Sequence, residues 1–460
     1  MDNSKMKITS VNPTTGNILK IYDELTSWDV SSKIEEAFKA SKLWKSKAFS
    51  QRSALMMKAG QVLNTQKESL ATLMAVEMGK PLKQGLAEVE KCMSVCKYYA
   101  EQAELLLAND VIKTEAQKSY VAFEPLGVVL AVMPWNFPLW QVFRFAAPTL
   151  MAGNVGLLKH ASNVPGCALA ISDIFREAGF PIGVFTTLLI SNKQVQSVIE
   201  NPMVSAITLT GSTVAGEAVA SQAGRVLKKT VLELGGSDAY LVLEDADLDL
   251  AASACVDSRL INSGQSCIAA KRFIVVDTIL EPFTEKFVAL MKSKKTGDPL
   301  IEQNHVGPQA RRDLRDQLHK QVLASVKQGA SLILGGQTPP EDKSSFYPPT
   351  VLSNVKPGMT AFEEEIFGPV AAIVSATDEN EAVRMANSSI YGLGSAIFSR
   401  DIERAENIAS RLQAGSSFVN SLVFSDPRLP FGGIKNSGYG RELGSYGIKE
   451  FVNVKTVYIK

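Results

Sequence analysis

A cysteine and a glutamate lie in two short segments that could together perform acyl chemistry. Cys267 follows a Gly-Gln-Ser sequence, and Glu233 is followed closely by the pair Gly235 and Gly236. A thiolate can attack a carbonyl carbon and hold the acyl group, and a carboxylate can activate the water that releases it. Taken alone, a buried structural thiol and a solvated carboxylate are the simpler interpretations. The two segments indicate an oxidative acyl-transfer site only as a pair.

Thiolate attack needs an ionised sulfur and donors for the oxyanion that forms. A free cysteine has a pKa of about 8.5. The sequence before Cys267 suggests a loop that enters a short helix, whose N-terminal N–H groups would favour the thiolate. Asn136, between Pro134 and Pro138, offers an uncharged amide donor on a stiff loop. The alternative for Asn136 is a residue selected for its turn-forming backbone.

Residues 210–216, Thr-Gly-Ser-Thr-Val-Ala-Gly, could hold a phosphate. The segment follows an apolar strand and opens a predicted helix, so Gly211 permits a tight turn beside free N–H groups. It lacks the GxGxxG pattern, and an ordinary strand-to-helix turn is the alternative. Lys159 and Ser162 follow another predicted strand, where a dinucleotide fold meets the adenosine ribose.

These segments lie in a chain whose sequence pattern alternates between predicted strands and predicted helices. Residues 128–133 form a continuous apolar run, typical of a buried parallel strand. Alternation continues to about residue 222, and a second alternating block spans 239 to about 431. This pattern predicts an α/β protein with doubly wound parallel sheets. Residues 451–459 alternate like an exposed strand, which would invite pairing with another chain.

Composition excludes several other classes of protein. The chain has 460 residues, of which 45% are hydrophobic and 21% charged, and its net charge is +1. This near-neutral balance argues against nucleic acid as a partner, and we find no apolar run long enough for a membrane span. Five scattered cysteines and no apolar leader favour free thiols in the cytoplasm. No spacing of ligands predicts a metal site.

Six segments occur in an order that resembles the NAD(P)-dependent aldehyde dehydrogenase superfamily, and most closely its succinate-semialdehyde dehydrogenases. The similarity covers about residues 8–460. It implies an aldehyde-dehydrogenase-like fold with a dinucleotide-binding domain (1–103 and 126–235), a catalytic domain (236–442) and a small β oligomerisation element (104–125 and 443–460). It also implies a homodimer or homotetramer. The six segments are 134–138, 210–216, 233–236, 264–267, 365–369 and 430–433.

The resemblance assigns a role to each candidate residue. Cys267 would be the nucleophile that forms a thiohemiacetal and a thioester, and Glu233 would activate the hydrolytic water. Asn136 and the Cys267 N–H would hold the oxyanion. The cofactor would be NAD or NADP, because Ser162 stands where members strict for NAD commonly carry a repelling Glu. The residues expected to bind it are Trp135, Lys159, Ser162, Gly211, Ser212, Gly216, Leu234, Glu365 and Phe367. His160 replaces the family's usual Pro.

The resemblance also indicates the substrate. Arg144 and Ser425 match residues that bind the distal carboxylate in the succinate-semialdehyde subgroup, and an arginine suits a carboxylate because its donors form a rigid fork. An ion pair and a loop hydroxyl are the alternatives for these two residues. Ile261 stands where some members have a second Arg, for which Arg259 or Arg428 could substitute.

Succinic semialdehyde is therefore the expected substrate, and an uncharged aliphatic aldehyde is the second choice. A CoA-acylating dehydrogenase would use the cysteine without needing Glu233. A non-enzymatic structural protein would need neither group. None of the three histidines lies in a segment resembling a Cys–His hydrolase, which disfavours a cofactor-free thiol hydrolase.

Overall fold

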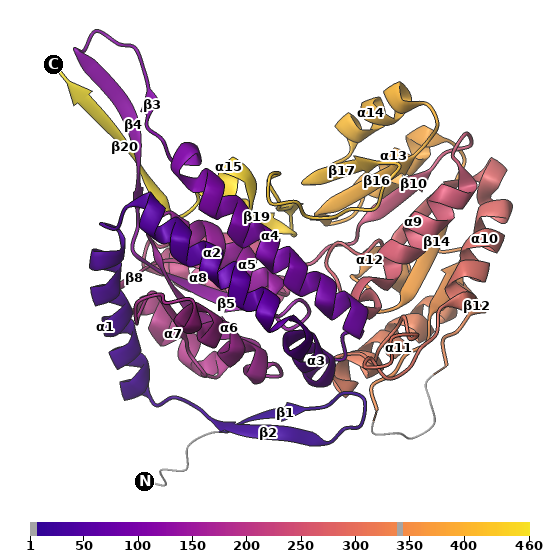
Figure 1. Cartoon of the computed structure of the whole chain (residues 1–460). Coiled ribbons are helices and arrows are strands. Elements are labelled where there is room, and N and C mark those ends of the chain that lie inside the picture. The colour runs from indigo at the N-terminus through magenta and orange to yellow at the C-terminus, as the bar shows by residue number, and fades with distance from the viewer. Residues whose placement is uncertain (1–6, 338–343) are drawn as a thin grey trace.

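A computed structural model describes residues 7–337 and 344–460. Two lobes, each built on a parallel sheet, face each other across the molecule (Figure 1). The first lobe holds a six-stranded sheet in the order β19-β9-β8-β5-β6-β7, in which only β19 is antiparallel to its neighbour. Its strands are β5 (Val128–Met133), β6 (Val155–His160), β7 (Phe185–Thr187), β8 (Val204–Thr210), β9 (Lys229–Glu233) and β19 (Gly438–Tyr439).

The second lobe is built on a seven-stranded sheet in the order β12-β13-β14-β11-β10-β16-β17. All its pairings are parallel except that of β12 with β13. Its strands are β10 (Ala239–Val242), β11 (Arg272–Val276), β12 (Ser331–Leu334), β13 (Thr350–Ser353), β14 (Val370–Ala376), β16 (Gly394–Phe398) and β17 (Ser416–Val419).

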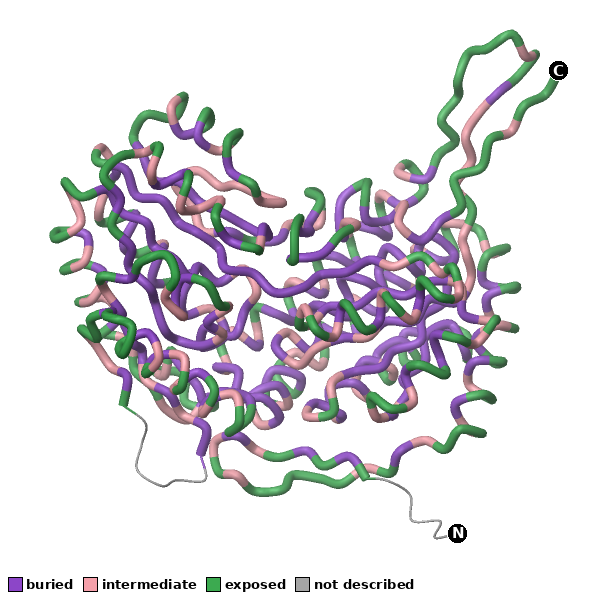
Figure 2. Tube along the Cα trace, turned by 180° about the vertical axis from the view of Figure 1, so that it is seen from behind, coloured by how far each residue is buried: buried purple, intermediate pink, exposed green. Residues whose placement is uncertain are grey.

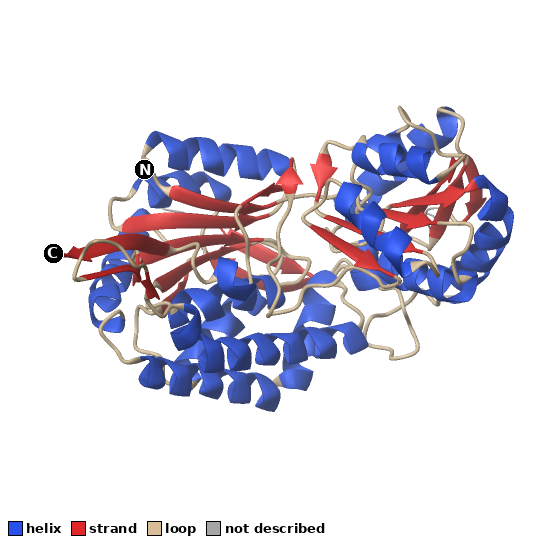
Figure 3. Ribbon diagram, turned by 90° about the horizontal axis from the view of Figure 1, so that it is seen from above, coloured by secondary structure: helices blue, strands red, loops and turns tan. Residues whose placement is uncertain are grey.

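Helices cover both faces of the two large sheets, which Figure 3 shows from above. The first lobe carries α1 (Ser27–Trp44), α2 (Phe49–Thr65), α3 (Lys67–Met78), α4 (Leu82–Leu106), α5 (Trp140–Met151), α6 (Pro165–Glu177), α7 (Asn192–Glu200), α8 (Thr213–Arg225) and α15 (Gly444–Gly447). The second carries α9 (Leu248–Leu260), α10 (Leu280–Ser293), α11 (Arg312–Lys327), α12 (Thr360–Glu363), α13 (Glu379–Asn387) and α14 (Ile402–Arg411), with short 3-10 turns η1 (Ile261–Gly264) and η2 (Asp277–Ile279).

Three small sheets complete the fold. The hairpin of β1 (Lys7–Val11) and β2 (Ile18–Asp23) runs beneath the first lobe, and β15 (Tyr391–Gly392) pairs with β18 (Ile434–Lys435). A three-stranded sheet of β3 (Asp110–Val111), β4 (Lys118–Pro125) and β20 (Val452–Ile459) projects away from the lobes. The strand β20 is thus paired with β4 along its whole length, and no strand of the described residues pairs with its other edge.

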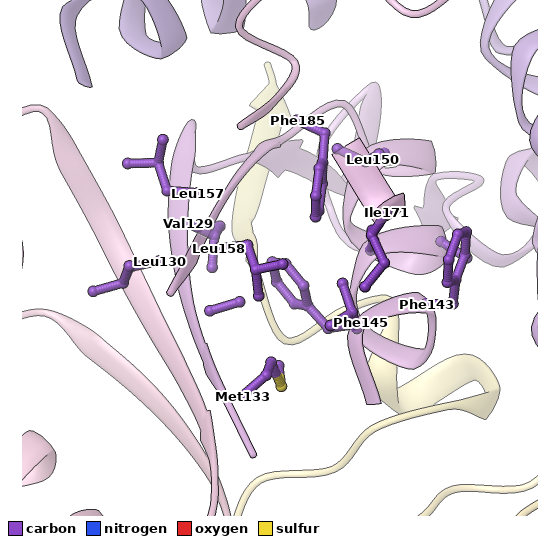
Figure 4. Packing of buried hydrophobic residues seen from close by; sticks show 14 of the residues in the cluster. Val129, Leu130, Met133, Phe143, Phe145, Leu150, Leu157, Leu158, Ile171 and Phe185 are labelled. Carbon is purple, nitrogen blue, oxygen red and sulfur yellow. The ribbon is translucent and has the colours of Figure 1, made fainter. Parts of the chain in front are cut away.

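The apolar run that predicted a central strand lies in the middle of the first core. Val129 and Leu130 of β5 and Leu157 of β6 are fully buried, and Phe143 of α5 packs on Phe175 of α6 with ring centroids 5.2 Å apart. Figure 4 shows part of this packing, and Figure 2 shows buried chain running through both lobes. Burying each such side chain contributes about 1.5–3 kcal/mol, so these contacts fix the sheet that carries the site.

The predicted α/β fold with two parallel-sheet units is confirmed. The division into residue ranges stays a prediction, although one short strand bears on it. β19 lies in the six-stranded sheet, where Gly438 pairs with Glu233, although its residues fall at the end of the predicted catalytic range 236–442. Among the helices of the described residues, none is long and apolar enough to cross a membrane.

Candidate active site

The site lies where parallel strands of the first sheet end and the second lobe faces them. Loops leave β5, β8 and β9 at their carboxyl ends, where ligands of open α/β sheets bind. A cavity of about 260 Å³ opens there. Eight predicted residues line it: Trp135, Asn136, Gly211, Ser212, Leu234, Cys267, Glu365 and Phe367. Pro134, Thr210 and Gly235, from the segments singled out in the sequence, also line it, and the lining residues that sequence reasoning missed are Gln141, Leu314, Gln317, Leu318 and Gln321.

Cys267 lies in a turn, and the short helix expected after it is absent. The 3-10 turn η1 precedes it instead, and Asn262 and Ser263 within η1 have positive φ angles of 50° and 58°. Such angles are uncommon for residues other than glycine. Arg259, fully buried, supports the turn by donating to the Gly264 carbonyl at 2.8 Å. The expectation of a helix N-terminus at the thiol is therefore wrong, because the chain turns into β11.

The nucleophile loop is held from below by a buried lysine. Lys271 Nζ donates to the carbonyl oxygen of Cys267 at 2.6 Å and to that of Ser266 at 3.0 Å. Its ammonium also lies 3.6 Å from a Glu365 carboxylate oxygen. Since Cys267 is bound through its carbonyl, its side chain and N–H are left for chemistry. Burial raises the pKa of the Cys267 thiol to about 12, so the protein at rest favours the thiol form.

Asn136 is tied to the same loop. Its side-chain Nδ2 donates to the main-chain carbonyl oxygen of Gln265 at 3.1 Å. The main-chain carbonyl oxygen of Asn136 accepts from Asn262 Nδ2 at 2.6 Å. An amide nitrogen has two hydrogens, and among the described residues only one of them has a partner. Asn136 is buried and lines the cavity with Cys267. The structure thus brings the predicted oxyanion donor to the predicted nucleophile.

Glu233 ends β9 as a buried carboxylate. Only 2% of the residue is exposed, and its Oε1 has no hydrogen-bond partner among the described residues. Desolvation raises its pKa well above the usual range, Arg144 opposes the rise, and Glu442 adds to it. A Cβ at Gly432 would lie 2.7 Å from Oε1, so this glycine leaves the space for the carboxylate. A buried acid with a raised pKa has the properties of a general base or acid.

The start of α8 fits a phosphate. Ser212 caps the helix by accepting from the Ala215 N–H at 3.3 Å, and the first helical N–H groups have no partner within the helix. Gly216 packs closely against Leu234, because a Cβ there would lie 2.5 Å from a Leu234 methyl carbon and would displace that side chain. Gly216 therefore supports the cavity wall from behind, whereas Gly211, Ser212 and Leu234 line it.

The opposite wall of the cavity comes from the second lobe. Glu365 Oε1 accepts the Gly236 N–H at 3.0 Å, and a Cβ at Gly235 would lie 2.5 Å from Oε2. The glycine pair therefore lets the chain approach this carboxylate closely. The rings of Phe367 and Trp135 meet edge to face with centroids 5.8 Å apart. A carboxylate beside an aromatic wall can bind a sugar hydroxyl next to a flat ring.

Lys159 and Ser162 lie farther along the same sheet edge and outside this cavity. Lys159 Nζ donates to Asn192 Oδ1 at 2.6 Å, and desolvation lowers its pKa to about 8. Ser162 is exposed. Between them His160 Nδ1 accepts the Ala161 N–H at 2.8 Å, so Nε2 carries the proton and donates to the Pro138 carbonyl at 2.9 Å. His160 therefore anchors the loop that bears Asn136.

Arg144 has its charge offset by a neighbouring carboxylate. It is buried and forms an ion pair with the buried carboxylate of Glu442, while Nη2 lies 3.4 Å from Thr210 Oγ1. Its guanidinium stacks 4.7 Å from the centre of the Phe431 ring. The two residues proposed to substitute for a second arginine also have partners within the protein. Arg259 is buried against main-chain carbonyls, whereas Arg428 is exposed and paired with Asp426.

Ser425 is buried, and its hydroxyl accepts a hydrogen bond of 2.7 Å from Lys91 Nζ. Lys91 lies on α4, far from Ser425 in sequence, and sequence analysis missed it. The sequence shows Lys91 only as one charged residue of an amphipathic helix. Charged residues in such helices usually face solvent, so this position did not indicate a site. Glu442 was missed for a similar reason, because no pattern marks it as the partner of Arg144.

Comparison with known proteins agrees with this geometry. Residues 1–457 match the model of the Aldehyde dehydrogenase family. Succinate semialdehyde dehydrogenase (NAD(P)+) Sad of Escherichia coli is 46% identical over 449 residues, covering 98% of this chain and 97% of its own. Succinate-semialdehyde dehydrogenase (NADP(+)) of Mycobacterium leprae is 46% identical over 457 residues, covering 99% of this chain and 100% of its own.

A solved structure also has the same fold as this chain. The succinic semialdehyde dehydrogenase of Streptococcus pyogenes, crystallised with NADP+, superposes with a TM-score of 0.96 at 37% identity. The superposition covers 98% of this chain and 99% of that one. With a family match over nearly the whole length, the chain belongs to the aldehyde dehydrogenase family and is an aldehyde-oxidising oxidoreductase.

Proposed function

We propose that this enzyme oxidises succinic semialdehyde to the carboxylic acid with NAD or NADP. The observation that carries the proposal is the meeting of Cys267 and Asn136 at a cavity whose walls suit a dinucleotide. Relatives named for this activity cover nearly the whole chain at 46% identity. An uncharged aliphatic aldehyde is the second candidate, because Arg144 is neutralised by Glu442.

The residues divide the reaction between them. The Cys267 sulfur attacks the aldehyde carbon to form a thiohemiacetal, and the free hydrogen of Asn136 Nδ2 stabilises the oxyanion. When bound, the nicotinamide supplies a hydride acceptor. Glu233 in its ionised form takes a proton from water that attacks the resulting Cys267 thioester. Burial raises the pKa values of Cys267 and Glu233. The reactive thiolate and carboxylate forms therefore become more populated as the pH rises.

The cofactor would lie along the carboxyl edge of the first sheet. Gly211 and Ser212 would receive a phosphate at the start of α8, and Glu365 would accept the hydroxyls of the nicotinamide-side ribose. Lys159 and Ser162 would face the adenosine ribose. A lysine and a neutral hydroxyl present no repulsion to a 2′-phosphate, so this site supports NADP as well as NAD.

Steady-state reduction of NAD and of NADP with succinic semialdehyde and with butanal tests the proposal. We expect a kcat/KM for the semialdehyde that exceeds that for butanal by at least tenfold. Equal values would make the enzyme a general oxidiser of aliphatic aldehydes. Reduction that depends on added CoA would reject the hydrolytic role of Glu233.

We also propose that copies of the chain assemble through the open edge of β20. Val454 and Tyr458 are 61% and 55% exposed on this strand, and no strand of residues 7–337 or 344–460 pairs with the edge opposite β4. A second copy that added its own strand there would cover both, giving a homodimer or homotetramer. Sedimentation of the wild type and of a Val454→Lys, Tyr458→Lys variant tests this, since a monomeric wild type would contradict it.

A further inference from the structure

The distal carboxylate of a semialdehyde needs a cation, and the arginine expected to provide it is already paired. Arg144 and Glu442 form a buried ion pair, so the pair as a whole carries no net charge. Glu442 contacts Nε of Arg144, so a second carboxylate at the terminal nitrogens would meet a pair with no net charge.

Lys91 is a cation in the same region with no carboxylate partner. Among the described residues no acidic oxygen lies within 4.0 Å of its Nζ, and the only hydrogen bond recorded is to Ser425 Oγ at 2.7 Å. An ammonium has three donors, which leaves two for a ligand. The ammonium also lies 4.4 Å from the centre of the Trp140 ring, which favours a cation there.

The acidic residues near Lys91 are committed elsewhere. Glu88, one helical turn before it, forms a buried ion pair with Lys80 and accepts the N–H groups of Leu139 and Trp140 at 2.9 Å. Asp426 pairs with Arg428, which lowers the pKa of the Asp426 carboxyl to about 2. Lys91 is therefore left as an unneutralised charge that is only partly exposed.

The position of Lys91 relative to the site follows from the helix it contacts. Glu88 fixes α4 to the first turn of α5, directly after the loop of Asn136. On α5, Trp140 contacts Lys91 and the next residue, Gln141, lines the cavity of Cys267. Arg144 lies one turn farther along α5, and repulsion from it adds to burial in lowering the pKa of Lys91 to about 8.

We propose that Lys91, with Ser425, is the specificity-determining cation that binds the distal carboxylate of the semialdehyde. In this arrangement Arg144 is a positioning residue on α5 whose charge is offset by Glu442. The inference rests on the proposed function and adds to it the residue that selects the substrate. The Ser425 hydroxyl oxygen accepts a hydrogen bond from Lys91, so its hydrogen remains able to donate to the distal carboxylate of the substrate.

The test compares substrate preference in the purified full-length enzyme and its variants. Lys91→Met keeps the length of the side chain and removes its charge, and Lys91→Gln keeps a polar group near Ser425. Lys91→Arg restores the charge. Lys97→Met, at an exposed position of the same helix with its side chain 65% exposed, is the matched control. Each is assayed for kcat/KM with succinic semialdehyde and with butanal, and each is checked by urea unfolding.

We expect Lys91→Met and Lys91→Gln to lower the preference for the semialdehyde by about tenfold to a hundredfold, the loss typical of a hydrogen bond to a charged group. The loss should appear mainly in KM, Lys91→Arg should recover most of it, and Lys97→Met should match the wild type. If both uncharged variants keep the wild-type preference for the semialdehyde, the proposed role of Lys91 is wrong. The proposed substrate of the enzyme would not be affected by that result.

A binding measurement separates this failure from failure of the proposed function. Succinate and butyrate are offered as competitive inhibitors, which requires no turnover of the semialdehyde. Tighter inhibition by succinate in the wild type, lost in Lys91→Gln, supports Lys91. If the wild type prefers neither the semialdehyde nor succinate, the proposed substrate class is wrong and the role of Lys91 falls with it.

Discussion

Replacing Glu233 by Gln separates the two halves of the proposed reaction. The substitution keeps the shape of the side chain in its buried position and removes the base that activates water. General base catalysis contributes about a hundredfold to ten-thousandfold in rate. Removal of the base should therefore raise the barrier to acyl release by about 3–5 kcal/mol. Attack by Cys267 and oxyanion binding by Asn136 should continue, because Asn136 is held by the Gln265 carbonyl oxygen and neither step uses the Glu233 carboxylate.

Stability should change in the opposite direction to activity. Burial raises the pKa of Glu233 in the folded state above its unfolded value, so ionisation of this group opposes folding at any pH above the unfolded pKa. The cost grows until the pH passes the folded pKa. A neutral glutamine carries no such cost, and the Tm of the variant at neutral pH should equal or exceed that of the wild type.

Rapid mixing with excess aldehyde and cofactor provides the assay. We expect a burst of reduced cofactor that approaches one equivalent per active site, followed by turnover slowed by the factor above. Glu285→Gln, which removes an exposed carboxylate on α10, is the control and should show wild-type turnover. Steady turnover in Glu233→Gln at the wild-type rate without a burst would refute the assignment of the base.

Four further outcomes are expected. Cys267→Ala should bind cofactor with unchanged affinity in a fluorescence titration and reduce none of it; measurable reduction would exclude this thiol as the nucleophile. Ser162→Glu should lower the ratio of NADP to NAD use by at least tenfold, since like charges within hydrogen-bond distance cost about 1–4 kcal/mol, and an unchanged ratio would place the 2′-phosphate elsewhere. Glu442→Gln should lower the free energy of unfolding in urea by about 3–5 kcal/mol, because it leaves the buried Arg144 charge unpaired; an unchanged midpoint would contradict a buried pair. Raising the pH should speed acyl release in the wild type, because burial raises the pKa of Glu233 and so shifts ionisation of the base to higher pH; a rate that does not depend on pH would argue against a titrating base.

The parts of the site that depend on short local patterns could be predicted from the sequence. The run 128–133 forms β5 as predicted, and the segment after β8 opens a helix with Ser212 as its cap. Such signals depend on neighbours in the chain, so apolar runs and glycine positions carry them directly. The resemblance to a family then supplied roles that no local pattern could, such as those of Glu365 and Phe367.

Contacts between distant segments could not be predicted. Lys91 meets Ser425, and Arg144 meets Glu442, across hundreds of residues, so only the folded arrangement shows that one cation is paired and the other is not. The environment of Cys267 was mispredicted for a different reason. A Gly-Gln-Ser sequence is compatible with several turns, and buried support from Arg259 and Lys271 selects the observed one.

The pairing of β19 with β9 has a consequence for synthesis on the ribosome. Glu233 ends a strand whose outer neighbour, starting at Gly438, is translated about 200 residues later. At roughly 5–20 residues per second, that interval lasts roughly 10–40 s. During it, the edge of β9 has no partner and the pocket of the base lacks Gly432, which also arrives late. The nascent first lobe is therefore exposed to mispairing at the strand that bears its base, and the pocket of Glu233 is complete only after Gly432 and Gly438 have been translated.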